Sequence, residues 1–310
     1  MQLHLFGAAT PTGEAFRQLA AAATPDWSLH AYSRNAIGGV HPADFSTPHA
    51  FHPAGDAAAP GLWISFGPIW LLAPFLEHLA HHHPERLSGL RGLIACSSSS
   101  AITKRFAANR LDRELAARLT AAEDLLIASC RRLGIPCRIL RPTLIYGQAG
   151  PYGDHNLSRL IGLMRRWPLL PLPEHTGLRQ PIHATQLAAV ALHLARQLAG
   201  SGVDSVLGER IALGGDSILS YRSMLQALQQ ALPPTDPARR CRLLSIPNRL
   251  FLLLASPVLL VSPKAFEAVL RMGADLAGFS ASHQLLGQPA QAFPVLPLAG
   301  VQAQPRRSAR

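Results

Sequence analysis

The chain has 310 residues, of which 48% are hydrophobic and 15% charged, so it can bury a full-sized core and is not disordered throughout. Its formal net charge of +11 comes almost wholly from arginine, because Lys104 and Lys264 are the only lysines. The arginines are dispersed and show neither a long basic run nor a zinc-finger or RNA-motif spacing, which argues against a nucleic-acid partner.

Strand-like and helical segments alternate over the first two-thirds of the chain, which is typical of a parallel sheet covered by helices. The predicted strands are Leu3–Phe6, Ser28–Tyr32, a short one near Val40, Leu62–Phe66, Leu90–Cys96, Cys137–Tyr146 and Arg210–Leu213. The predicted helices are Gly13–Ala22, Ile69–His83, Asp112–Leu133, Asn156–Arg166 and Gln186–Ala199. The fold class is therefore α/β, with a doubly wound parallel sheet.

The pattern changes after Gly214, where prolines interrupt a series of helical segments. This predicts a smaller, mostly helical lobe without a further strand of any strength. The longest apolar run, Leu250–Val261, is too short to cross a bilayer and contains Pro257, so we expect a buried pair of helices and no membrane span. The polar and basic residues 302–310 are predicted to form a flexible tail.

The loop after the first predicted strand has the form of a phosphate-binding turn. Gly7 follows the strand and Gly13 lies in the first turn of the next helix. Thr10 and Pro11 fit the N-cap and the first helical position, so backbone N–H groups and the positive end of the helix would face a ligand. An ordinary strand-turn-helix connection is the alternative.

The end of the second predicted strand favours NADP over NAD. An acidic residue at this place would hold the ribose hydroxyls of NAD, but the chain has Ser33 there, followed by Arg34. A hydroxyl and a guanidinium suit a 2′-phosphate, and no carboxylate is present to repel it. The alternative for Arg34 is a surface arginine without a ligand.

Further motifs follow in a fixed order along the chain. They are "ADF" (Ala43–Phe45), "ISFGP" (Ile64–Pro68), "SSSS" (Ser97–Ser100), "RPTLIYG" (Arg141–Gly147), "GLRQPIHATQLA" (Gly177–Ala188), "LGGDSILSYRSML" (Leu213–Leu225) and "RMGADLAGFSASHQLLGQPAQAF" (Arg271–Phe293). With the glycine loop, in which the pattern T-G-x-x-G-x-x-G falls on Phe6, Gly7, Thr10 and Gly13, they resemble the extended short-chain dehydrogenase/reductase family. This is the NAD-dependent epimerase/dehydratase group that includes the nucleoside-diphosphate-sugar epimerases, and the resemblance covers nearly the whole chain.

The resemblance implies a Rossmann-type cofactor domain with a substrate-binding lobe. The expected cofactor domain is residues 1–147 with 186–214, and the expected lobe is residues 148–185 with 215–301. By the same resemblance, Asp44 would lie near adenine, Phe66 and Gly67 beside the ribose, and Asn156 and Arg179 at the diphosphate of the substrate. The implied partner is a small molecule such as a nucleotide sugar, and a homodimer is compatible with the family.

The residues that carry the family's chemistry are absent. The family uses a Ser or Thr, which falls on Ser99, with a Tyr and a Lys four residues apart on the following helix, and these positions fall on Leu115 and Leu119. No tyrosine lies between Ser33 and Ile145. Two leucines cannot exchange a proton with a hydroxyl group, so the usual proton relay is missing.

Two residues could replace the relay. Lys104 follows Ser99 on a loop expected to cross the site, although a loop lysine is more often a solvated charge. Tyr146 ends a strand and either lines the cleft or fills the domain junction. Two hypotheses follow: a catalytically atypical NADP-dependent enzyme, which we slightly favour, and a non-catalytic NADP-binding sensor or assembly partner.

Neither the histidines nor the cysteines predict a metal centre. His78 and His82 have the spacing of a chelating pair, but no third ligand follows at a fixed offset, so a polar helix end is the preferred interpretation. The four cysteines form no C-x-x-C pair, and reduced thiols in a cytoplasmic protein explain them best.

Overall fold

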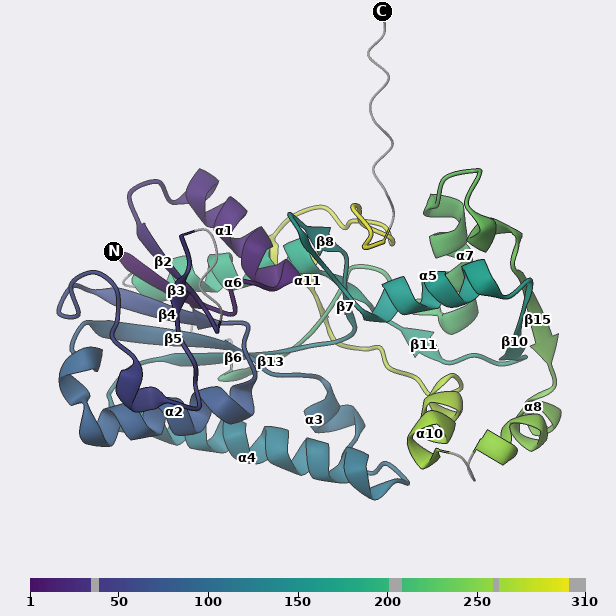
Figure 1. Cartoon of the computed structure of the whole chain (residues 1–310), viewed down its shortest axis with the longest axis horizontal. Coiled ribbons are helices and arrows are strands. Elements are labelled where there is room, and N and C mark those ends of the chain that lie inside the picture. Colours follow the sequence, from purple (N-terminus) through teal and green to yellow (C-terminus); the bar gives the residue numbers. More distant parts are fainter. Residues whose placement is uncertain (35–38, 201–207, 259–261, 301–310) are drawn as a thin grey trace, which may run out of the picture.

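The computed structural model describes residues 1–34, 39–200, 208–258 and 262–300. The predicted flexible tail, 302–310, lies outside these residues. Figure 1 shows two parts side by side: a layered α/β part that contains the N-terminus, and a smaller part built around the second half of the chain. Among the described residues, no helix is long and apolar enough to cross a membrane.

An eight-stranded sheet forms the centre of the larger part, with the strand order β16-β13-β6-β5-β4-β1-β2-β3. All of its neighbouring strands pair in parallel. The strands are β1 (Gln2–Phe6), β2 (Ser28–Ser33), β3 (His41–Pro42), β4 (Gly61–Ser65), β5 (Leu90–Cys96), β6 (Cys137–Pro142), β13 (Arg210–Gly214) and β16 (Ser280–Ala281). The chain order reverses between β1 and β4, and open α/β sheets bind ligands beyond the carboxyl ends of the strands at such a point.

Helices cover both faces of the sheet (Figure 1). On one face α1 packs against α6, and on the other α2 packs against α4. Their bounds are α1 (Pro11–Ala23), α2 (Ile69–His82), α4 (Arg110–Arg132) and α6 (Ala184–Ala199), with the short α3 (Ser100–Thr103) before α4 and α11 (Ser282–Leu286) beside α6. Each face has its own buried apolar cluster, so the sheet is covered by two hydrophobic layers, as a parallel sheet requires. This confirms the predicted fold class.

The smaller part has its own core and more strand than the sequence predicts. Its helices are α5 (Asn156–Arg166), α7 (Tyr221–Ala231), α8 (Asn248–Ala255) and α10 (Pro263–Arg271). Leu157, Met164, Met224 and Leu228 are among the side chains buried between α5 and α7. The short strands are β7 (Ile145–Tyr146), β8 (Gln148–Ala149), β9 (Tyr152–Gly153), β10 (Leu169–Pro173), β11 (Leu178–Arg179), β12 (Ile182–His183), β14 (Leu219–Ser220) and β15 (Arg242–Ile246).

Two expectations about the second half of the chain are wrong. Strands do occur after Gly214, because β15 pairs in parallel with β10, more than 60 residues earlier in the chain. The apolar run from Leu250 is also not buried over its described residues, 250–258, because α8 buries only Phe251; residues 259–261 of the run lie outside the part that the structure describes. A local sequence pattern could predict neither the pairing of β15 nor the exposure of α8, since each depends on which distant segment packs against the element.

Candidate functional site

A cleft of about 840 Å³ opens at the carboxyl ends of β1, β2, β4 and β5. Its walls also include the first turns of α1 and α2, one side of α4, and Tyr152 from β9. Of the predicted cofactor residues, the cleft is lined by Gly7, Thr10, Ser33, Arg34, Asp44, Phe66 and Gly67. These predicted residues come from four separate stretches of sequence and meet at the point where the sheet topology places a ligand site.

The first strand-to-helix turn has no room for side chains at its two glycines. Gly7 has a φ of +78°, and a Cβ there would lie 2.9 Å from the backbone N of Gly67. A Cβ on Gly13 would lie 2.2 Å from the carbonyl oxygen of Gly7. Both glycines therefore allow α1 to begin directly against the ends of β1 and β4.

Thr10 closes this turn with its side chain. Its Oγ1 accepts a hydrogen bond from the backbone N–H of Gly13 at 3.0 Å and donates one to the carbonyl of Gly7 at 2.8 Å. Pro11 has no N–H, so the free backbone N–H in the first turn of α1 is that of Thr12, which has no acceptor within the described chain. The positive end of α1 still faces the cleft, with fewer free N–H donors than an uncapped helix would offer.

The far end of the cleft carries Arg34 and Asp44. Arg34 is exposed at the end of β2 and makes no ion pair with any described residue. Asp44 stands nearby: two hydrogen bonds from Ser46 lower the pKa of this carboxyl, and the positive charge of Arg34 lowers it further. A ligand at this end would meet a guanidinium that is not held in an ion pair with a described residue.

The opposite end of the cleft, which we call the reaction end, combines serine hydroxyls with an aliphatic wall. Cys96, Ser97, Ser98 and Ser100 line it from the end of β5, and Leu115 and Leu119 line it from α4. Burial raises the pKa of Cys96 to about 12, so its thiol stays protonated at neutral pH. The two leucines are the residues on which the resemblance places the family's Tyr and Lys, and both line the cleft.

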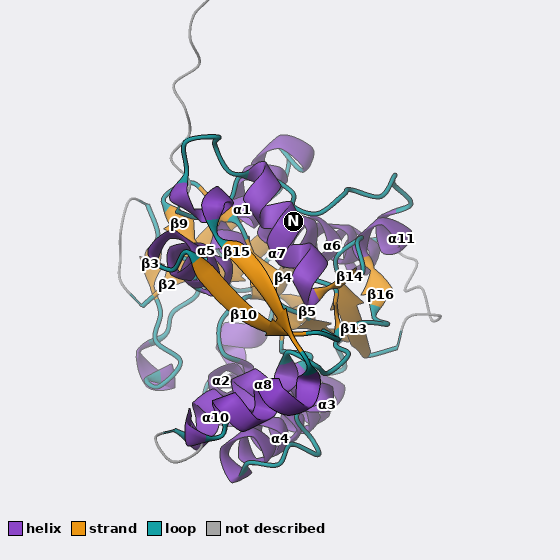
Figure 2. Cartoon of the chain, turned by 90° about the vertical axis from the view of Figure 1, so that its right-hand side faces the viewer, coloured by secondary structure: helices purple, strands orange, loops and turns teal. Residues whose placement is uncertain are grey.

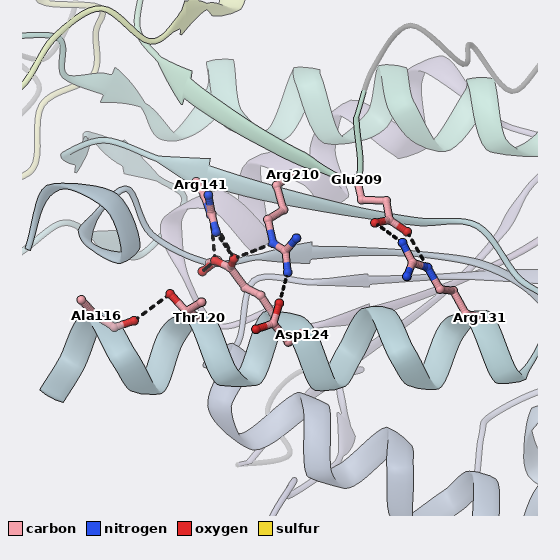
Figure 3. Close-up of polar contacts among 9 residues, drawn as sticks. Ala116, Thr120, Asp124, Arg131, Arg141, Glu209 and Arg210 are labelled. Carbon is pink, nitrogen blue, oxygen red and sulfur yellow. Dashed lines mark hydrogen bonds and ion pairs between the residues drawn. The ribbon is translucent and has the colours of Figure 1, made fainter. Parts of the chain in front are cut away.

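Ser97 is tied to a buried carboxylate beneath the cleft. Its hydroxyl donates to Glu123 at 2.5 Å, and Glu123 is fully buried. Arg141 from β6 makes a two-pronged ion pair with Glu123, and Arg210 from β13 bridges Glu123 and the exposed Asp124 (Figure 3). This network joins α4 to three neighbouring strands, so the position of the reaction end depends on it.

The three proposed catalytic residues do not line the cleft. Ser99 lies between lining serines, and its backbone N–H donates to Pro142. The Lys104 ammonium contacts Asp112 at 2.6 Å, and Asp112 also holds Arg271 from α10. Lys104 is thus part of an ion cluster that joins the start of α4 to the smaller part.

Tyr146 fills the junction between the two parts. It is 1% exposed, its hydroxyl accepts a hydrogen bond from the backbone N–H of Val295 at 2.8 Å, and its ring meets those of His183 and Phe293 edge-on. Burial raises the pKa of Tyr146 well above its usual value. Of the two alternatives left open by the sequence, the structure places this residue in the junction.

The two predicted substrate residues also lie outside the cleft lining. Asn156 is exposed at the start of α5. Arg179 is buried, stacks on Tyr221 and donates to the carbonyls of Leu178, Ala274 and Arg271. Burial lowers the pKa of Arg179, and its contacts hold the connection after α10 in place.

Several lining residues were missed from the sequence. Ile69, Trp70 and Leu71 line the cleft because α2 begins directly after the "ISFGP" motif, which was the available signal. The guanidinium of Arg118 lies 4.4 Å from the centre of the Trp70 ring, at the same side of the cleft. Tyr152 reaches the cleft from a hairpin, and no local pattern indicates that. No described group of three or more His, Cys, Asp or Glu side chains could hold a metal ion.

Comparisons with known proteins support the fold and no more. No family model and no curated protein matches the sequence. Among solved structures, UDP-glucuronic acid 4-epimerase from Bacillus cereus in complex with NAD has a TM-score of 0.61 at 14% identity, covering 94% of this chain and 92% of that one. UDP-N-acetylglucosamine 4-epimerase from Bacillus cereus has a TM-score of 0.60 at 13% identity, covering 94% of both chains.

A human epimerase family protein with NADPH gives a similar result, with a TM-score of 0.60 at 13% identity and coverage of 95% of this chain and 96% of that one. Such low identity says nothing about a shared activity. The chain has the extended short-chain dehydrogenase/reductase fold seen in the nucleotide-sugar epimerases.

Proposed function

We propose that the chain binds NADP(H) in the cleft at the carboxyl ends of β1, β2, β4 and β5. The observation that carries the proposal is Arg34, an exposed guanidinium at the end of β2 that lines the cleft without an ion-pair partner among the described residues. A 2′-phosphate would supply that partner, and Ser33 beside it adds a hydroxyl. The turn from Gly7 to Gly13 brings the positive end of α1 to the same cleft for the pyrophosphate.

The structural neighbours use both cofactors. The human epimerase family protein and a Pseudomonas aeruginosa protein were solved with NADPH, whereas the UDP-glucuronic acid 4-epimerase was solved with NAD. The neighbours therefore support a nicotinamide dinucleotide, and the preference for NADP(H) rests on Arg34 and Ser33. When bound, the cofactor would supply a hydride donor or acceptor at the reaction end of the cleft.

A titration of the purified protein with NADPH and with NADH tests the proposal. We expect tighter binding of NADPH, and Arg34→Ala should weaken it by about tenfold or more, because a hydrogen bond between charged groups contributes about 1.5–3 kcal/mol. NADH binding should change little. Arg91→Ala, which removes an exposed arginine outside the cleft, is the matched control. Equal weakening of NADPH and NADH binding by Arg34→Ala would contradict the assignment.

A specific observation favours cofactor binding without the proton exchange at a substrate hydroxyl that the resemblance implies. Leu115 and Leu119 occupy the wall of the reaction end, where a proton donor would have to stand. Lys104 is held by Asp112, and Tyr146 is held by Val295 in the domain junction. We propose that the chain acts as an NADP(H)-dependent binding or sensing protein.

The alternative is an atypical reductase or epimerase whose proton comes from a serine of the reaction end or from water. One structural neighbour was solved with UDP-glucose and NAD, which makes sugar nucleotides the first substrates to test. Reproducible turnover of any sugar nucleotide with NADP(H), lost in Ser97→Ala combined with Ser98→Ala, would establish the enzyme. A complete panel without turnover, with intact NADPH binding, would support the sensing role.

A further inference from the structure

The end of the smaller part exposes a group of large apolar side chains. It is formed by β10, β15 and α8, which lie at the right of Figure 1 and face the viewer in Figure 2. β10 pairs with β15, and α8 packs against β10, so the three elements are neighbours at this end of the molecule. We name this surface the apolar tip, and its exposed members are Trp167, Leu169, Leu244, Leu250, Leu253 and Leu254.

The side chains of α8 account for most of the apolar tip. Leu253 and Leu254 are 68% and 61% exposed, and Leu250 shares their side of the helix because residues three and four apart lie together. Phe251 points inward and is the buried residue of this helix. α8 therefore packs through one aromatic ring and presents its leucines outward, where no described element covers them.

Most charges around the apolar tip are positive, and Glu174, which is exposed directly after β10, is a negative charge beside them. Arg166, Arg240, Arg242 and Arg249 are exposed and make no ion pair with described residues. The sequence from residue 237 to residue 258 contains four arginines and no Asp or Glu. The nearby Asp236 is neutralised by Arg165 at 2.7 Å. Exposed leucines and a tryptophan are thus bordered by arginines that lack a partner.

We propose that the apolar tip binds the surface of an anionic lipid bilayer. Phosphate headgroups would pair with the free arginines, while the leucines enter the boundary of the acyl chains and Trp167 lies at the headgroup level. An anionic bilayer surface therefore offers phosphates to the arginines and an apolar boundary to the leucines at the same time. Since no described helix can cross a bilayer, the contact is peripheral and α8 lies along the surface.

Co-sedimentation with lipid vesicles tests this proposal. The intact chain is mixed with phosphatidylcholine vesicles and with vesicles in which about a third of the lipid is phosphatidylglycerol, at low and high salt. We expect binding to the anionic vesicles only, and weaker binding at high salt because ions screen the arginines. Binding to neither kind of vesicle would overturn the proposal.

Matched variants separate the apolar tip from other exposed leucines. Leu253→Ser combined with Leu254→Ser should weaken anionic-vesicle binding by about tenfold or more, because two leucines would no longer leave water. Leu111→Ser changes a leucine of α4 that is 64% exposed and should leave vesicle binding unchanged. If both changes weakened vesicle binding equally, the assignment of this binding to the apolar tip would be contradicted. NADPH titration of each variant reports whether the fold is intact.

The competing occupant is a second copy of the chain. In that case the native molar mass in solution would rise with protein concentration, and the double leucine variant would remain a monomer. If a dimer forms, is lost in Leu253→Ser with Leu254→Ser, and no vesicle binding is seen, then the partner of the apolar tip is a second copy of the chain and not a bilayer. A monomer at all concentrations that binds anionic vesicles supports the bilayer.

Discussion

Glu123 provides the sharpest test of how the reaction end is held in place. Its carboxylate is fully buried and accepts hydrogen bonds from Ser97, Arg141 and Arg210. Glu123→Ala removes the one carboxylate that the structure pairs with Arg141, whose side chain is only 15% exposed. Arg210 keeps Asp124 as a partner, so Arg141 carries most of the cost.

We expect Glu123→Ala to lower the free energy of unfolding by about 3–5 kcal/mol, the range for breaking a buried ion pair by removing one partner. Asp124→Ala removes a carboxylate from the same helix that is 63% exposed, and it should cost less than about 1 kcal/mol. Urea unfolding measures both values from the shift of the midpoint at a constant slope.

A double-mutant cycle refines the comparison. If the cost of Glu123→Ala comes from an unpaired Arg141, then Glu123→Leu combined with Arg141→Met should be much more stable than the sum of the two single changes predicts. The reasoning fails if Glu123→Ala costs no more than Asp124→Ala. It also fails if the two single effects simply add.

Three further predictions concern stability, the junction and the cofactor turn. Burial lowers the pKa of His4 from 6.5 to about 4, so protonation favours the unfolded chain. The free energy of unfolding should therefore fall by about 3 kcal/mol between pH 6.5 and 4. His4→Gln should flatten this pH dependence in urea unfolding at several pH values, and an unchanged dependence would contradict the prediction. Tyr146→Phe leaves the N–H of Val295 without its acceptor, so it should lower the free energy of unfolding by about 1 kcal/mol and leave NADPH affinity unchanged. Loss of turnover without loss of stability would instead make this tyrosine catalytic. Gly7→Ala should abolish NADPH binding in the titration, since its Cβ would lie 2.9 Å from backbone atoms. Gly162→Ala has open space around the new side chain and should retain binding. Equal binding by both variants would show that the turn tolerates a side chain.

The central sheet could be predicted from the sequence because short, largely apolar strand-like segments alternate with longer helical ones. β1, β4 and β5 are buried on both faces, so their composition marks them without knowledge of their partners. The lobe strands β10 and β15 could not be predicted in this way. β10 contains prolines, β15 has three exposed residues out of five, and each becomes a strand only by pairing with the other.

The edge of the sheet at which the cleft opens was predictable for a similar reason. Gly7 and Phe66 follow directly after strands and Ser33 ends one, and a parallel sheet brings the carboxyl ends of its strands to one edge. Tyr146 was a candidate on the same argument, and Lys104 was a candidate because its loop follows Ser99, but the side chains of both contact partners elsewhere. Strand ends fix the position of a backbone, whereas the direction of a long side chain depends on neighbours that come from distant segments.

The two ends of the cleft therefore lead to different expectations about function. At the far end, Arg34 is exposed and makes no ion pair with a described residue, so its guanidinium is open to an anionic ligand. At the reaction end, Leu115 and Leu119 make an aliphatic wall, and Glu123, the carboxylate that Ser97 contacts, is already paired with arginines. Binding and proton transfer are separable in this geometry, because we propose that binding uses the strand ends and the start of α1, whereas the proton relay that the resemblance implies uses side chains of α4. We therefore expect NADPH affinity to survive in variants of the α4 wall that leave the strand ends and the start of α1 intact.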